Sequence, residues 1–350
     1  GIIGRMGGVF SVIEDNHIHH INNMMEQGGA EIAGIKMHAA IDVTMRRNHI
    51  HHCTMGIWCD WEAQGTRLTQ NLLHDNQKPA YAKSLNGGMM SQDIFVEVGH
   101  GPTLIDNNVM LSDASLRFAT EGVALVHNLI CGALTCVGDG TGWRYTPYHM
   151  PHRTEVMGFM TILHGDDRIY NNIFVQKWPS EDVIIPHDSD EGFDSENRKA
   201  GTWMFDEYPT YDEWISQFDF TKPVDMKKLE PVHFGHLPVW IEGNVYLNGA
   251  EACKNEVNGL VISDKEAKVD LVEKEGSYYL DTNVYDLVGE FKDRMIHSDI
   301  LGKAFEPEQR FENPDGTAIQ FDKDYFGGHR GMDVIPGPFA QAEDAKKVLF

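Results

Sequence analysis

The sequence is poor in basic residues and contains no long hydrophobic run. No apolar stretch approaches the roughly 20 residues that a transmembrane helix requires, and the mean hydropathy is −0.36. The 350 residues include 29 Lys and Arg against 53 Asp and Glu, a formal net charge of −24. Nucleic acids and anionic membrane surfaces are bound through clustered basic side chains. We therefore expect neither as a partner.

Cysteine and proline are also scarce, with 5 and 14 residues respectively. The odd number of cysteines and the absence of a C-x-x-C pair argue against a disulfide framework and a cysteine-rich metal site. We expect buried free thiols and, because disulfides are not evident, a cytoplasmic location. The cysteines are Cys53, Cys59, Cys131, Cys136 and Cys253.

A repeated motif is present instead, in which Asn follows a short apolar stretch and precedes two mostly apolar residues. Its successive steps are 32, 23, 37, 20, 44 and 72 residues, and the shortest are typical of a single coil of a solenoid. The remaining steps fit two coils, or one coil with an inserted loop. The repeated residues are Asn16, Asn48, Asn71, Asn108, Asn128, Asn172 and Asn244.

The units combine strands, glycine-containing turns and Asn turns, without amphipathic helices or a leucine ladder. This pattern predicts an all-β chain that folds as a right-handed parallel β-helix, because Asn tolerates left-handed turns and its amide can bond along a stack. We expect the β-helix over 1–250, with insertions at about 77–92, 138–157 and 179–236. Residues 251–350 lose the repeat, and we expect a C-terminal cap or wrap there.

Aligning the coils by their Asn turns places three charged residues together. The offsets of 37 and 20 residues put Asp60, Glu97 and Arg117 in one column on successive rungs. An alignment on Gly65 and Gly101 would instead shift the register by one residue. The Asn alignment is preferred because the residues that follow Asn match in type.

Neighbouring strands lie roughly 4.7–4.9 Å apart, so the carboxyl groups of Asp60 and Glu97 should be about 5 Å apart. Retaining glycosidases separate their nucleophile and acid/base carboxyls by roughly 5–5.5 Å, whereas inverting enzymes need about 6.5–9.5 Å. A stacked acidic ladder that binds calcium, or a solvated polar face, remains an alternative at this point. Trp58, Trp61 and His100 lie beside the pair, where they could contact a sugar or pack against the solenoid.

Histidines recur in register with the Asn turns. The segments 17–20 and 49–52 read HIHH in both cases. Imidazoles are suitable zinc ligands, but stacked packing is the simpler interpretation. We therefore predict no metal site.

Two segments resemble glycoside hydrolase family 120. They are residues 56–67, which read GIWCDWEAQGTR, and residues 93–102, which read DIFVEVGHGP; the stretch 145–152 adds to the likeness. The resemblance covers at least residues 1–178 and implies a parallel β-helix with a β-sandwich domain. It also implies that Asp60 is the nucleophile and Glu97 the general acid/base of a β-xylosidase.

The family places its β-sandwich and first coils before the matched region, and the sequence starts with Gly. We therefore expect a C-terminal portion of a longer enzyme. The resemblance implies a retaining exo-β-xylosidase acting on xylobiose and short xylo-oligosaccharides. We expect no cofactor; structural calcium and a homo-oligomer stay open. The candidates for binding the sugar are His38, Trp58, Trp61, His100, Arg117 and Glu121.

Two other functions remain open from the sequence. Gly99-His100-Gly101 is similar to a segment of polygalacturonases, and an Arg117 beside Glu97 would suit a pectin lyase. A non-catalytic carbohydrate-binding β-helix is the third interpretation.

Overall fold

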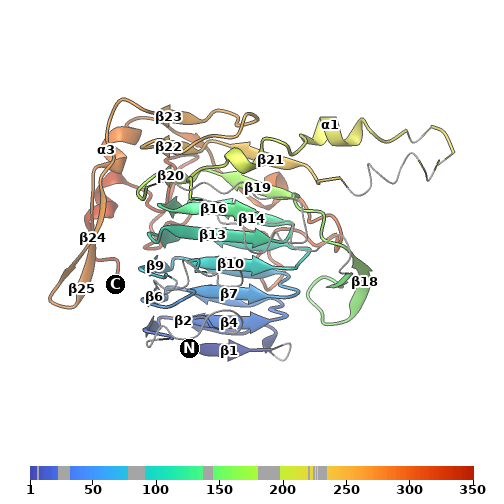
Figure 1. Cartoon of the computed structure of the whole chain (residues 1–350), viewed down its shortest axis with the longest axis horizontal. Helices are drawn as coiled ribbons and strands as arrows, with labels where there is room; N and C mark the ends of the chain where they lie inside the picture. Colours follow the sequence, from blue (N-terminus) through green and yellow to red (C-terminus); the bar gives the residue numbers. More distant parts are fainter. Residues whose placement is uncertain are drawn as a thin grey trace.

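A computed structural model of the chain shows a stack of short parallel strands (Figure 1). The coils rise from the N-terminus, and three sheets run along the stack. The described residues are 1–5, 8–22, 32–77, 91–136, 145–179, 198–219, 221–223, 225, 227 and 235–350. None of their helices is long and apolar enough to cross a membrane.

All strand pairs within the three sheets are parallel, and each coil contributes strands to successive sheets. The prediction of an all-β parallel β-helix is therefore confirmed. Sheet one contains β1 (Ile2–Gly4), β4 (Ile35–His38), β7 (Ile57–Asp60), β10 (Ile94–Glu97), β13 (Ala114–Ala119) and β16 (Ala133–Cys136). Sheet two contains β2 (Val12–Glu14), β5 (Thr44–Arg46), β8 (Thr66–Thr69), β11 (Thr103–Asp106), β14 (Val123–Val126), β19 (Asp167–Tyr170) and β21 (Val239–Glu242). Sheet three contains β3 (His17–His19), β6 (His49–His51), β9 (Leu72–His74), β12 (Val109–Met110), β15 (Leu129–Ile130), β20 (Ile173–Val175), β22 (Val245–Leu247) and β23 (Leu260–Ile262).

The repeated asparagines form a continuous ladder in the turns before sheet three. In each step the side-chain amide donates to the Oδ1 of the next Asn, at 2.9–3.0 Å. The backbone amide of the same residue donates to that oxygen as well. Glu256 accepts from Asn244 at the end of the ladder. The stacking predicted from the repeat is confirmed.

The interior of the solenoid is filled by alternate apolar side chains from each strand. On sheet one these include Ile57, Cys59, Ile94 and Val96, all buried in a single core. The intervening residues of the same strands point outward because strand side chains alternate between faces. All five cysteines are buried free thiols, as predicted.

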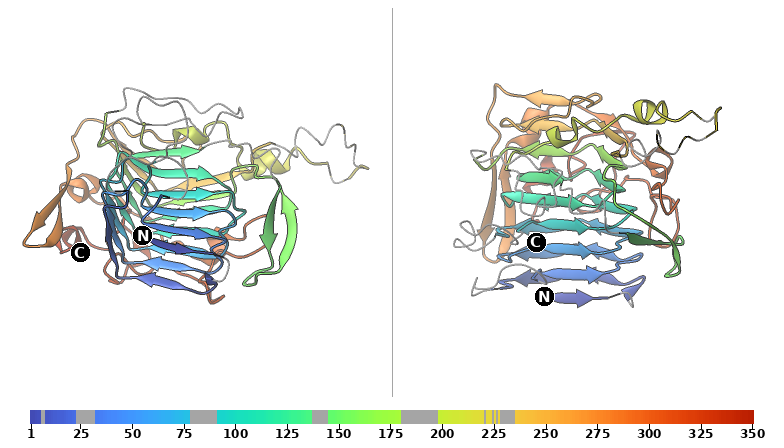
Figure 2. Two further views of the ribbon diagram at one scale, coloured as in Figure 1. Left: turned by 60° about the horizontal axis from the view of Figure 1, so that its bottom comes forward. Right: turned by 45° about the vertical axis from the view of Figure 1, so that its right-hand side comes forward.

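The C-terminal segment lies along the outside of the β-helix (Figure 2). One apolar cluster joins it to sheet three and another joins it to sheet two. β23 continues sheet three beyond residue 250, so regular strands extend into the segment expected as the cap. The remaining elements are β24 (Val269–Lys274), β25 (Ser277–Thr282), α3 (Val284–Val288), β26 (Asp293–Arg294), α4 (Ser298–Leu301), β27 (Asp333–Val334) and η6 (Ala342–Lys346).

The expected insertions are partly described. The stretch around 138–157 contains the antiparallel hairpin of β17 (Thr146–His149) and β18 (Val156–Met160). The stretch around 179–236 contains η5 (Trp203–Phe205) and α1 (Tyr211–Ile215). Most of the 77–92 insertion, residues 78–90, lies outside the described residues.

Candidate active site

Asp60 and Glu97 end neighbouring strands of sheet one. The register pairs Val96 of β10 with Cys59 of β7, an offset of 37 residues that places Glu97 beside Asp60. This is the offset predicted from the Asn repeat. Both residues belong to the outward-facing set of their strands, and both are buried. Strand spacing therefore puts the two side chains about 5 Å apart at their origin.

Lys36 holds the carboxylate of Asp60. Its ammonium Nζ lies 2.5 Å from Oδ2 of Asp60 and 3.1 Å from Nε2 of His38. His38 also lies 3.0 Å from the same Asp60 oxygen, as expected for a residue aligned with Asp60 in the register of β4 and β7. Lys36 is fully buried and sits 4.0 Å above the Trp58 ring. A buried cation of this kind needs a charged partner, which Asp60 provides.

Sequence reasoning missed Lys36, although the sequence contains a clue. In β4, Lys36 and His38 alternate with the apolar Ile35 and Met37, which enter the core. A lysine on the outward face of a strand aligned with the Trp58 and Asp60 pair could have been placed in the site once the 22-residue offset of these coils was known.

Trp58 positions Glu97 through its ring nitrogen. The indole Nε1 donates to Oε2 of Glu97 at 3.0 Å, and the ring is buried against Phe95. The structure thus places Trp58 under the carboxyl pair, as a hydrogen-bond donor to one of its members. Trp61, by contrast, is exposed just after Asp60 and has a left-handed backbone.

The predicted position of Arg117 is wrong. β13 pairs Arg117 with Phe95 and Ala119 with Glu97, an offset of 22 residues, not 20. The turn between Glu97 and Thr103 is two residues longer than the turn between Ala119 and Val123, although the next strands return to an offset of 20. Arg117 is buried one side-chain position away from Glu97 on the same face, with its guanidinium 5.8 Å from the Phe95 ring.

His100 and Glu121 form a buried pair behind the carboxyl groups. Nδ1 of His100 lies 2.6 Å from Oε1 of Glu121, and its Nε2 lies 3.1 Å from the carbonyl of Thr146. The other Glu121 oxygen accepts from the backbone of Leu163. Burial opposes charge on His100, but the neighbouring Glu121 carboxylate raises the pKa of the imidazole above its usual value. The pair therefore connects coil turns to the β17 hairpin, and its contact with sugar stays a prediction.

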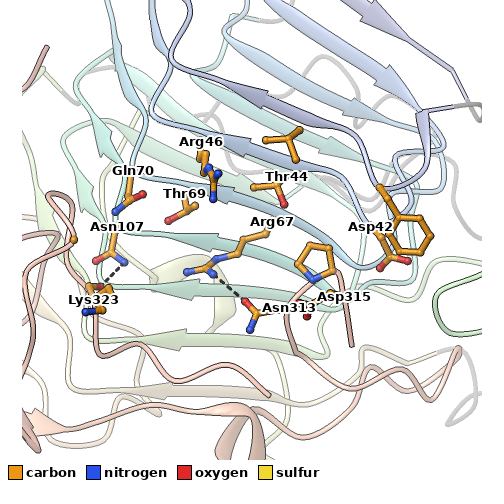
Figure 3. A pocket seen from close by; sticks show the side chains of 14 residues that line it. Asp42, Thr44, Arg46, Arg67, Thr69, Gln70, Asn107, Asn313, Asp315 and Lys323 are labelled. Carbon is orange, nitrogen blue, oxygen red and sulfur yellow. Dashed lines mark hydrogen bonds between the residues drawn. The ribbon is translucent and has the colours of Figure 1, made fainter. Parts of the chain in front are cut away.

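A separate cavity of about 580 Å³ lies on sheet two, under the C-terminal segment (Figure 3). Arg67 extends into it and contacts Asn313 at 3.1 Å, while Asp106 binds the Arg67 guanidinium at 2.8 Å. None of the predicted site residues lines this cavity. Its cations are paired with carboxylates, so it is distinct from the Asp60 and Glu97 site.

The comparisons with known proteins agree with this geometry. No family model and no curated protein matches the chain. A solved structure described as "The complex structure of XylC with xylose" matches 97% of the chain at 35% identity, with a TM-score of 0.81. The chain spans about half of that protein, 48% of its length.

This similarity extends over the strands that carry Asp60 and Glu97 and over the C-terminal segment. It agrees with the resemblance of segments 56–67 and 93–102, which the register brings together at one edge of sheet one. The chain therefore belongs to glycoside hydrolase family 120.

Proposed function

We propose that the protein is a retaining exo-β-xylosidase that hydrolyses xylobiose and short xylo-oligosaccharides. Asp60 is its nucleophile and Glu97 its general acid/base. The observation that carries this proposal is the 37-residue register between β7 and β10, which puts the two carboxyl groups on adjacent strands. A strand spacing of about 4.8 Å suits the roughly 5–5.5 Å separation of a retaining pair better than the wider separation that an inverting water requires.

The contacts of the two carboxyl groups support different roles. Asp60 is paired with the ammonium of Lys36, which suits a group that attacks as an anion. Glu97 accepts a hydrogen bond from the neutral indole of Trp58 and lies beside Phe95, in less polar surroundings. Such surroundings suit a carboxyl group that must carry a proton at the start of the reaction.

The reaction then takes two displacements. In the first, an Asp60 oxygen attacks the anomeric carbon while the Glu97 carboxyl gives its proton to the departing glycosidic oxygen. In the second, the Glu97 carboxylate removes a proton from water, the water oxygen attacks the anomeric carbon, and the Asp60 carboxylate leaves. The exposed Trp61 ring is the candidate for stacking on the apolar face of the sugar.

The alternative of a pectin lyase loses its main argument. That alternative used an Arg117 directly beside Glu97, and the register instead pairs Arg117 with Phe95. A xylose-bound relative of similar fold favours a neutral sugar over an acidic one.

Alanine variants of the full-length protein test the proposal. Asp60→Ala and Glu97→Ala should each lower kcat on an aryl β-xyloside by at least ~10³-fold, because a nucleophile and its proton partner act as a unit. A panel of aryl glycosides identifies the sugar, and Glu308→Ala, on an exposed residue of the C-terminal segment, serves as the control. Near-normal rates in Asp60→Ala with an unchanged melting temperature would show that the assignment is wrong.

A further inference from the structure

Sheet three carries a cluster of histidines that the proposed reaction does not use. The cluster lies on the outward side of three neighbouring strands and their following turns, at the N-terminal end of the β-helix. Its members stack in register, with His17 opposite His49 and His19 opposite His51 and His74. The histidine cluster consists of His17, His19, His20, His49, His51, His52 and His74.

Nitrogen atoms of the cluster come close enough to share one ion. In His51, His52 and His74, one nitrogen from each ring lies within 4.8 Å of the others. His17, His49 and His51 form a second such group, so His51 belongs to both. The Nδ1 atoms of His51 and His52 are only 2.7 Å apart, a contact that two protonated rings could not make.

The rings are held in the form that binds metals. Burial, followed by the charges of neighbouring histidines, lowers the pKa of His51 to about 3 and that of His49 to about 2. The pKa of His52 is lowered as well. Neutral imidazoles with a free lone pair are the usual ligands of zinc and related ions.

An acidic side chain stands beside the first group. Oδ2 of Asp75 lies 2.6 Å from Nδ1 of His74, which fixes the orientation of that ring. The Asp75 charge also acts on His52. A carboxylate bonded to a ligand histidine is the common outer partner in metal sites, where it orients the ring and favours the cation. The second group has the aromatic rings of Phe350 and Tyr278 beside it.

We propose that His51, His52 and His74 bind one divalent transition-metal ion per chain, with Asp75 as the supporting carboxylate. Nitrogen ligands select zinc, nickel, copper or cobalt over calcium and magnesium, which prefer oxygen. The stoichiometry follows from His51, because a neutral imidazole offers only one lone pair and the two groups share this ring. His52 is partly exposed and gives the ion a route from solvent.

Zinc titration of the full-length, chelator-treated protein tests the site. Calorimetry with Zn²⁺ near neutral pH should show one equivalent bound, and Co²⁺ should give the absorption bands of nitrogen coordination. His52→Gln should weaken zinc binding by at least ~100-fold, because even outer-partner changes cost about 10–100-fold. Asp75→Asn should weaken it by about 10-fold.

Two matched variants control the experiment. His17→Gln, in the other group, and His329→Gln, an exposed residue of the C-terminal segment, should bind zinc as the unchanged protein does. Absence of stoichiometric binding, or equal binding by His52→Gln, would overturn the proposal. Loss of binding in His17→Gln with retention in His52→Gln would also contradict it. Thermal melting of each variant verifies folding, so that the outcome reports on the site.

Discussion

Lys36 is the residue that most restricts what Asp60 can do. Its fully buried ammonium contacts Asp60, His38 and the Trp58 ring, so every polar direction around Asp60 Oδ2 is occupied by a donor. Such an arrangement fixes the carboxylate in place before substrate arrives, which is how a nucleophile is held in an attacking position. Lys36 is a positioning residue, since it acts through Asp60.

Replacing Lys36 tests this role. Lys36→Met should lower kcat by about 100-fold with a smaller change in KM, because positioning is lost and substrate contacts are not. The acidic limb of the pH–rate profile should also move, since the cation beside Asp60 is removed. Lys274→Met, on the exposed end of β24, is the matched control. An unchanged kcat and pH profile in a folded Lys36→Met protein would contradict the positioning role.

At the scale of elements, the Asn ladder sets the register that brings the site together. Each rung is fixed by bonds to the next, so the spacing of strands in sheet three is constant along the stack. The sequence predicted this ladder and the pairing of β7 with β10, because the same 37-residue step separates both the asparagines and the carboxylates. It failed at Arg117, because turn length can change between sheets without changing the Asn spacing.

The central rungs should contribute strongly to stability. Asn128 donates to Asn172 and to the carbonyl of Ile105, and it accepts two bonds from Asn108. Asn128→Ala should lower the free energy of unfolding by about 2–4 kcal/mol, since buried backbone groups lose their partners. Denaturant unfolding measures the change.

Asn16→Ala is the control for the ladder, because Asn16 lies at its partly exposed start. Water can replace the lost bonds there, so this variant should cost less than about 1 kcal/mol. Equal losses at both positions would show that burial along the ladder does not determine its contribution.

At the scale of the whole molecule, the C-terminal segment joins sheets two and three from outside. Its apolar residues complete two of the chain's clusters, and Arg330 binds the side chain of Asn107 at 2.8 Å. Loss of the Asn repeat after residue 250 indicated a change of structure, but not the path of the segment. That path depends on contacts between residues more than 200 positions apart, such as this one, which periodicity does not encode.

Buried carboxyl groups should give the molecule a pH-dependent stability. Burial raises the pKa of Asp93 to about 7, despite hydrogen bonds from Ser112 and Asn76. The folded state therefore keeps a proton that the unfolded state loses near its ordinary value of 3.8. The stability from this proton is fully present below pH 4 and is lost as the pH rises through about 7.

The Asp93→Asn variant isolates this effect. Because the amide does not titrate, the stability of the unchanged protein relative to the variant should fall between about pH 4 and 7, by up to about 1.4 kcal/mol per pH unit. Above pH 7 the difference should be constant. Urea unfolding at several pH values measures it, and parallel curves across this range would contradict the assignment to Asp93.

The central claim is that Asp60 and Glu97 share one retaining reaction, and azide rescue tests it most directly. Asp60→Ala supplied with azide and an activated aryl β-xyloside should form the α-xylosyl azide, because azide replaces the nucleophile in a single displacement. Glu97→Ala should form the β-xylosyl azide, because azide then attacks the intermediate on Asp60. Proton NMR distinguishes the two anomers. The same anomer from both variants, or β-azide from Asp60→Ala, would contradict these roles.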